Sequence, residues 1–113
     1  NCMKSIRLMM ASVLVLIAAT AFSQTEKTDT FKVYGNCDMC KYRIEKAIKK
    51  DVVKSEWNPE TKMMTVTYDA GKISNDDLQK KIAAVGHDTE KFKAEDKVYK
   101  KLPDCCLYDR KKG

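Results

Sequence analysis

Four cysteines are the residues of this sequence with the clearest chemical potential, and they form two close pairs. Cys37 and Cys40 make a Cys-x-x-Cys motif, while Cys105 and Cys106 are adjacent. Cysteine thiolates bind soft metal ions, exchange with disulfides, or pair as structural bridges in oxidising compartments. The cysteine pattern alone therefore leaves metal binding, redox exchange and structural bridging open.

The residues around the Cys-x-x-Cys motif place it where a strand meets a helix. Alternating apolar residues predict a strand over 30–34, and apolar residues at helical spacing predict a helix over 38–50. Cys37 and Cys40 would share one face of the helix start, so both sulfurs can point at one ion. The helix N-terminus favours the thiolate, and Lys41 adds a cation beside the pair. Two thiolates without a nearby imidazole or carboxylate cluster favour soft ions such as Cu(I).

The rest of the chain continues the alternation of strands and helices. Two period-two segments around an Asn-Pro-Glu-Thr turn predict a hairpin, and a serine-capped segment with apolar residues at i, i+4 and i+7 predicts a second helix. The predicted elements are strands over 53–57 and 64–68, a helix over 75–85, a strand over 90–93 and helical turns over 95–102. This order predicts an α+β, ferredoxin-like βαββαβ sandwich, with an antiparallel four-stranded sheet, two helices on one face and a short C-terminal helical tail.

The segment over 31–93 resembles the heavy-metal-associated (HMA) domain, the module of copper chaperones, of the N-terminal repeats of metal-exporting ATPases and of the periplasmic mercuric-ion-binding protein. Four stretches and Leu78 carry the likeness. The stretches are Val-Tyr-Gly-Asn-Cys-Asp-Met-Cys-Lys over 33–41, Ile-Glu-Lys-Ala over 44–47, Thr-Val-Thr-Tyr-Asp over 65–69 and Ala-Val-Gly-His-Asp over 84–88. One departure is that Asn36 alone separates Gly35 from Cys37, where the family has a methionine and one further residue.

The resemblance implies that Cys37 and Cys40 bind the metal and that the protein is a metal carrier or chaperone. It would pass the ion to a metal-transporting partner protein by exchange of thiolate ligands. Cu(I) is the expected ion, with Zn(II) and Hg(II) as alternatives. Some members of the family have a histidine in the loop of His87 that approaches the bound copper, so His87 is a candidate additional ligand. We expect a monomer, with a metal-bridged dimer as the alternative.

Cys105 and Cys106 lie in a tail outside this resemblance. The predicted last strand ends at the pole opposite the motif, but a helix of about eight residues spans about 12 Å and can return the chain towards it. The pair would then add ligands to Cys37 and Cys40, and four thiolates suit Zn(II) or a multinuclear Cu(I) site. Disulfide pairing is the alternative, although a bridge between adjacent residues would be strained.

The N-terminal region is typical of an export signal. Lys4 and Arg7 precede an apolar run over 8–22, and small residues then flank a cleavage point near Ser23-Gln24. The run is shorter than the roughly 20 apolar residues that span a bilayer. We therefore expect a periplasmic or secreted protein with no stable membrane span after cleavage of the signal peptide.

The sequence thus divides into four segments. Asn1 and Cys2 precede the expected initiator Met3, so we treat them as not native. The segments are the signal peptide region over 1–23, a polar flexible leader over 24–29, the heavy-metal-associated domain over 30–93 and the C-terminal tail with the Cys-Cys pair over 94–113.

Composition and motifs argue against other function classes. The net charge is +6, but basic and acidic residues are interleaved and no basic stripe with aromatics appears, so we expect no nucleic-acid partner. One histidine and scattered acids give no catalytic constellation, so we predict no enzyme. The first alternative is a thiol-disulfide oxidoreductase, but no tryptophan precedes Cys37, and neither Pro59 nor Pro103 stands where a thioredoxin-like site needs one. The second is a structural four-cysteine zinc protein.

Overall fold

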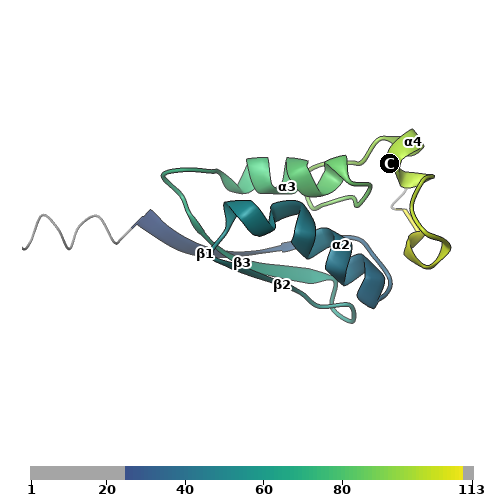
Figure 1. The fold of residues 1–113 in the computed structure, drawn as a ribbon, viewed down its shortest axis with the longest axis horizontal. Coiled ribbons are helices and arrows are strands. Elements are labelled where there is room, and N and C mark those ends of the chain that lie inside the picture. Colours follow the sequence, from purple (N-terminus) through teal and green to yellow (C-terminus); the bar gives the residue numbers. More distant parts are fainter. Residues whose placement is uncertain (1–24, 111–113) are drawn as a thin grey trace, which may run out of the picture.

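The computed structural model describes residues 25–110, which form a sheet with helices on one face (Figure 1). The predicted signal peptide and its cleavage point lie outside the described residues. Strands and helices alternate along the chain as the sequence predicts. The elements are β1 (Glu26–Lys32), α2 (Asp38–Ile48), β2 (Lys54–Trp57), β3 (Met63–Asp69), α3 (Asn75–Ala84) and α4 (Asp96–Tyr99), with short 3-10 turns at Lys49–Asp51 and Asp104–Cys106.

The sheet of the described residues is antiparallel and has the strand order β1-β3-β2. β3 is central: Phe31 of β1 and Trp57 of β2 both face Met64 across their ladders. Helices α2 and α3 lie side by side over one face of this sheet (Figure 1). The ferredoxin-like arrangement predicted from the sequence is therefore confirmed.

The fourth strand, predicted over 90–93, is reduced to an isolated bridge between Val33 and Thr89. The backbone N–H of Thr89 donates to the carbonyl of Phe92 at 2.8 Å, which closes a tight turn. The N–H of Lys91 donates to the Gln79 side chain at 3.0 Å. The N–H of Glu90 still donates to the carbonyl of Lys32 at 2.9 Å, but the groups that follow bond within the turn and to α3, so the pairing goes no further along β1.

Strand β1 begins at Glu26, inside the segment expected to be a flexible leader, and earlier than the predicted start at Thr30. Each residue from Glu26 onwards pairs with β3. Side chains reinforce the pairing, since the Tyr68 hydroxyl donates to Asp29 at 2.5 Å and the hydroxyls of Thr28 and Thr67 lie 2.9 Å apart. The prediction of a leader over 24–29 was wrong there, because polar residues that pair at a half-exposed edge show no apolar alternation.

The core lies between the sheet and the two helices. Helix α2 contributes buried side chains four residues apart, as expected of an amphipathic helix. Ser74 is the N-cap of helix α3, and its hydroxyl accepts a hydrogen bond from the N–H of Asp77, as predicted. The largest buried apolar side chains are Trp57, Tyr68, Phe31, Ile44, Ile48, Met64, Leu78 and Ile82.

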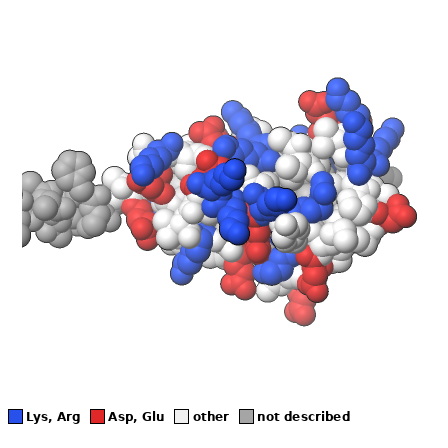
Figure 2. Space-filling model, in the orientation of Figure 1, with Lys and Arg blue, Asp and Glu red and all other residues white. Residues whose placement is uncertain are grey.

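Charges of both signs cover the surface. On the face drawn in Figure 2, lysine and arginine side chains alternate with aspartate and glutamate. Some charged side chains of the protein pair directly, as Lys81 does with Asp51 at 2.9 Å and Lys91 with Asp76 at 3.1 Å. Among residues 25–110, no helix has both the length and the apolar composition that a bilayer span requires.

Gly35 allows the loop before the first cysteine to pack directly on the core. A Cβ atom at this position would lie 3.0 Å from the ring of Trp57 and 3.1 Å from the Cβ of Cys40. Such distances are shorter than ordinary van der Waals contacts between carbon atoms, which are about 3.5–4.0 Å. The loop therefore has no room for a side chain at residue 35.

We predict that Gly35→Ala lowers the free energy of unfolding by about 1–3 kcal/mol, since overpacking a close-packed site costs that much. Urea denaturation of the reduced protein measures the effect. Gly71→Ala is the matched control, because the nearest group to its Cβ would be the Asp69 side chain at 3.2 Å in an exposed turn. Equal destabilisation by the two substitutions would contradict this account of the loop.

Candidate metal centre

The Cys-x-x-Cys motif lies at the junction of the first strand with α2, as predicted. Cys37 is the N-cap residue of α2 and is half-buried, and Cys40 lies in the first turn and is fully buried. Their sulfur atoms are 3.5 Å apart. The backbone N–H of Asn36 donates to the Cys40 sulfur at 3.4 Å, so the loop itself helps to orient the pair.

The surroundings of Cys37 stabilise its thiolate. Partial burial acts to raise the pKa of this thiol, but interactions with the backbone N–H groups of Cys40 and Met39 and with neighbouring thiols outweigh burial. Together they lower the pKa of Cys37 to about 7. A thiolate at neutral pH is the form that binds metal ions.

Lys41 does not have the role predicted for it. Its ammonium group donates to the carbonyl of Trp57 at 3.1 Å and pairs with the Glu45 carboxylate at 2.9 Å. The charge of Lys41 is thus engaged at the edge of the sheet by a hydrogen bond and an ion pair. The expectation that it serves as a cation for the thiols was wrong, because an acid one helical turn further on binds it instead.

The tail returns to the motif and brings the second cysteine pair with it. The sulfur atoms of Cys37, Cys105 and Cys106 all lie within 4.8 Å of one another. The sulfurs of Cys105 and Cys106 are 3.9 Å apart, and the Cys37 thiol donates to the carbonyl of Cys105 at 3.4 Å. All four of these cysteines are free thiols. The two cysteine pairs, which are far apart in the sequence, therefore lie next to each other in the structure.

Burial differs between the two tail cysteines. Cys106 is fully buried, and this burial, followed by its interaction with the Cys40 thiol, raises the pKa of Cys106. Cys105 is exposed, and its thiol points at the Met39 thioether with the sulfurs 3.7 Å apart. Each tail cysteine thus approaches a sulfur atom from the first turn of α2.

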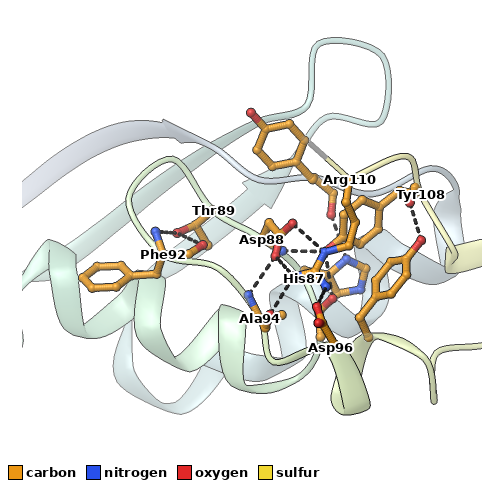
Figure 3. A network of polar contacts seen from close by, with 11 residues as sticks. His87, Asp88, Thr89, Phe92, Ala94, Asp96, Tyr108 and Arg110 are labelled. Carbon is orange, nitrogen blue, oxygen red and sulfur yellow. Dashed lines mark hydrogen bonds and ion pairs between the residues drawn. The ribbon is translucent and has the colours of Figure 1, made fainter. Parts of the chain in front are cut away.

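His87 lies outside the sulfur cluster. Among the described residues, the only convergent group of three or more metal-ligating side chains contains cysteines alone. The His87 ring is fully buried, its Nδ1 lies 2.8 Å from the carbonyl of Tyr34, and the ring stacks on Tyr108 (Figure 3). Burial lowers the pKa of His87 and favours its neutral form. The structure therefore shows this histidine in packing contacts beneath the tail.

The contacts that hold the tail were not anticipated from the sequence. The Tyr108 hydroxyl accepts from the N–H of Asp88 at 2.7 Å and donates to the carbonyl of Gly86 at 2.9 Å. The Arg110 guanidinium binds both carboxylate oxygens of Asp88, at 3.0 and 2.8 Å (Figure 3). Burial acts to raise the pKa of Asp88, but the bonds from Arg110 and from the backbone N–H of Ala94 outweigh it and lower the pKa. No local pattern in the tail marks these partners.

Several solved structures are similar to this chain. The CopZ metallochaperone is 26% identical, with a TM-score of 0.53 over 56% of this chain and 98% of that chain. Oxidised MerP from Ralstonia metallidurans CH34 is 34% identical, with a TM-score of 0.54 over 57% and 94%. The N-terminal domain of a potential copper-translocating P-type ATPase from Bacillus subtilis, in its Cu(I)-loaded state, is 27% identical, with a TM-score of 0.53 over 57% and 84%.

A search of curated proteins returns no match. The sequence model of the heavy-metal-associated domain matches residues 30–88, which is more than half of the chain and includes both residues of the Cys-x-x-Cys motif. The match agrees with the fold and with the position of the motif at the start of α2. The chain therefore belongs to the heavy-metal-associated domain family.

Proposed function

We propose that this protein is a soft-metal carrier that binds Cu(I) through the thiolates of Cys37 and Cys40. The observation that carries the proposal is the 3.5 Å separation of the two sulfurs at the start of α2, with a lowered pKa at Cys37. Sulfur ligands select soft ions over the hard ions that prefer oxygen. Zn(II) and Hg(II) are the alternative ions.

Ligand exchange is the proposed route of transfer. Cys37 is only partly buried, so an incoming thiolate of a metal-transporting partner can reach an ion held there. The neighbouring structures support this reading by what their names state: one is a metallochaperone and another is a Cu(I)-loaded domain of a potential copper-translocating ATPase. A monomer suits such exchange, with a metal-bridged dimer as the alternative.

Export is part of the proposal. The charged, apolar and small-residue order over 3–23 is that of a secretory signal, so the mature protein would begin at Gln24 in the periplasm or outside the cell. Amino-terminal sequencing of the exported protein tests this, and an N-terminus upstream of the apolar run would contradict it.

We further propose that the protein is not an enzyme, in preference to a thiol-disulfide oxidoreductase. A carrier has to hold its cysteines reduced for metal, whereas an oxidoreductase has to cycle them through a disulfide. The support is the family membership together with the lack of a thioredoxin-like motif at Cys37. Reduction of insulin by the protein at the rate of a thioredoxin would favour the enzyme instead.

We predict that Cys37→Ser and Cys40→Ser each abolish tight Cu(I) binding, because a hydroxyl is a poor ligand for a soft ion. Competition with a chromophoric Cu(I) chelator measures the affinity, and circular dichroism checks the fold. Tyr42→Ser is the control, since Tyr42 lies on the same helix with its side chain 64% exposed. Undiminished affinity in the double cysteine variant would refute the proposed function.

A second prediction concerns the acidity of Cys37. Because its pKa is lowered to about 7, the metal-free reduced protein should gain thiolate ultraviolet absorbance as the pH rises through 7. Above that pH the thiolate predominates, so metal binding there releases fewer protons. Cys37→Ser should remove this step. A wild-type titration with no step below pH 8 would contradict the assignment.

A further inference from the structure

We propose that the tail over 94–110 is a clasp that supplies Cys105 and Cys106 as ligands, so that the protein encloses one soft metal ion in a four-sulfur site with Cys37 and Cys40. This inference rests on the proposed function and extends it, since the family match ends at residue 88 and does not reach the second pair.

The distances between the sulfur atoms fit a shared ion. Sulfurs that coordinate one ion tetrahedrally at about 2.3 Å lie about 3.8 Å from one another. The observed separations are 3.5 Å between Cys37 and Cys40 and 3.9 Å between Cys105 and Cys106. Three of the four sulfurs also fall within 4.8 Å of each other across the two pairs. Cys37 is therefore close enough to both tail sulfurs to share an ion with them, and Cys40 joins the cluster through its contact with Cys37.

The burial of the four cysteines suits a site formed by four sulfur ligands. Cys40 and Cys106 are both fully buried, and a buried thiol without another role is inert packing. Here each buried thiol belongs to a pair whose other member is at least partly accessible, since Cys37 is half-buried and Cys105 is exposed. A site with two interior and two outer sulfurs lets an ion enter from the surface and be covered once bound.

The tail is fixed by contacts that involve no sulfur atom. Tyr108 is buried, bonds to the backbone at residues 86 and 88, and stacks on His87 at 5.5 Å between ring centroids. Leu102 lies so close to Gly86 that a Cβ there would be 3.0 Å from its side chain. Arg110 closes the end of the segment through Asp88 (Figure 3). Because these contacts flank Cys105 and Cys106 on both sides, they position the pair before any ion arrives.

The position of Asn36 adds an independent link between the two pairs. Its side-chain amide donates to the carbonyl of Cys105 at 3.5 Å, and its backbone N–H donates to the Cys40 sulfur at 3.4 Å. Asn36 is the residue that stands alone between Gly35 and Cys37, where the family has a methionine and one further residue. The residue immediately before the motif is thus the one that meets the tail.

The clasp is tested by loading the reduced protein with Zn(II) or Cu(I) and counting sulfur neighbours by X-ray absorption. With Zn(II), wild type should show four sulfurs, and a Cys105→Ser/Cys106→Ser variant should show two. Its Zn(II) affinity should fall by more than about 100-fold, since even outer-shell changes cost 10–100-fold. Leu107→Ser, at a 39% exposed position between the pair and Tyr108, is the matched control and should bind as wild type.

A second variant separates the role of the clasp from that of the ligands. Arg110→Gln leaves every sulfur in place but removes the bonds to Asp88, so Zn(II) affinity should fall about 10-fold while the number of ions bound stays at one. Lys97→Gln in the same segment, where the lysine side chain is 80% exposed, should have no effect. Cys105→Ser alone changes an exposed residue and leaves the buried Cys106 in place. Its sulfur count should fall to three, which tests the clasp even where the double variant misfolds.

The outcomes are distinguishable. If wild type binds neither ion, the proposed function fails. If wild type binds Cu(I) tightly with two sulfur neighbours, and the tail variants bind equally well, the carrier stands and the clasp is overturned. A disulfide that consumes Cys105 or Cys106 in protein isolated under oxidising conditions, with unchanged metal affinity after reduction, would overturn the clasp as well.

Discussion

The indole of Trp57 is the group against which the sulfur loop, helix α2 and the sheet are all positioned. Its N–H donates to the carbonyl of Val33 at 3.0 Å, and its backbone N–H donates to the Glu45 carboxylate at 2.9 Å. Its ring also leaves no space for a side chain at Gly35. The end of the first strand is thus bonded to the ring of Trp57, and the helix that carries Cys40 is bonded to the backbone of the same residue. Because a close-packed interior transmits small displacements, we expect a shift of this ring to move Gly35 and, with it, the loop before Cys37.

A second constraint acts where the family domain ends. Asp88 is a buried carboxylate, and an uncompensated buried charge is strongly unfavourable; breaking such a pair by removing one partner costs about 3–5 kcal/mol. Arg110 supplies the compensating charge, and the backbone N–H of Ala94 supplies a further bond at 2.7 Å. The tail therefore compensates the buried charge of Asp88 whether or not a metal ion is bound. The same contacts fix the position of Cys105 and Cys106, which lie in this segment.

The sequence predicted those parts of the fold whose signals are local. Apolar periodicity gave α2 and α3, the cap at Ser74 was confirmed, and the cysteine motif was correctly expected at a strand-to-helix junction. The predictions that failed concern segments whose structure depends on residues distant in the sequence. The pairing of β1 from Glu26 needs β3, and the turn at Thr89 competes with the strand expected over 90–93. The contact of Cys105 with Cys37 spans 68 residues, so the sequence could show only that the tail was long enough to return.

Retention and transfer make opposite demands on a thiolate site, and the tail bears on both. A two-sulfur site leaves an ion open to an incoming thiolate, whereas four sulfurs fill the coordination shell of a tetrahedral ion. If the clasp supplies the second pair, a partner can take the ion only after Cys105 and Cys106 withdraw or are replaced one at a time. The exposed position of Cys105 makes it the ligand that an incoming thiolate can replace first, while Cys106 is buried. Stepwise exchange would then begin at the tail and end at Cys40, the other sulfur that solvent does not reach.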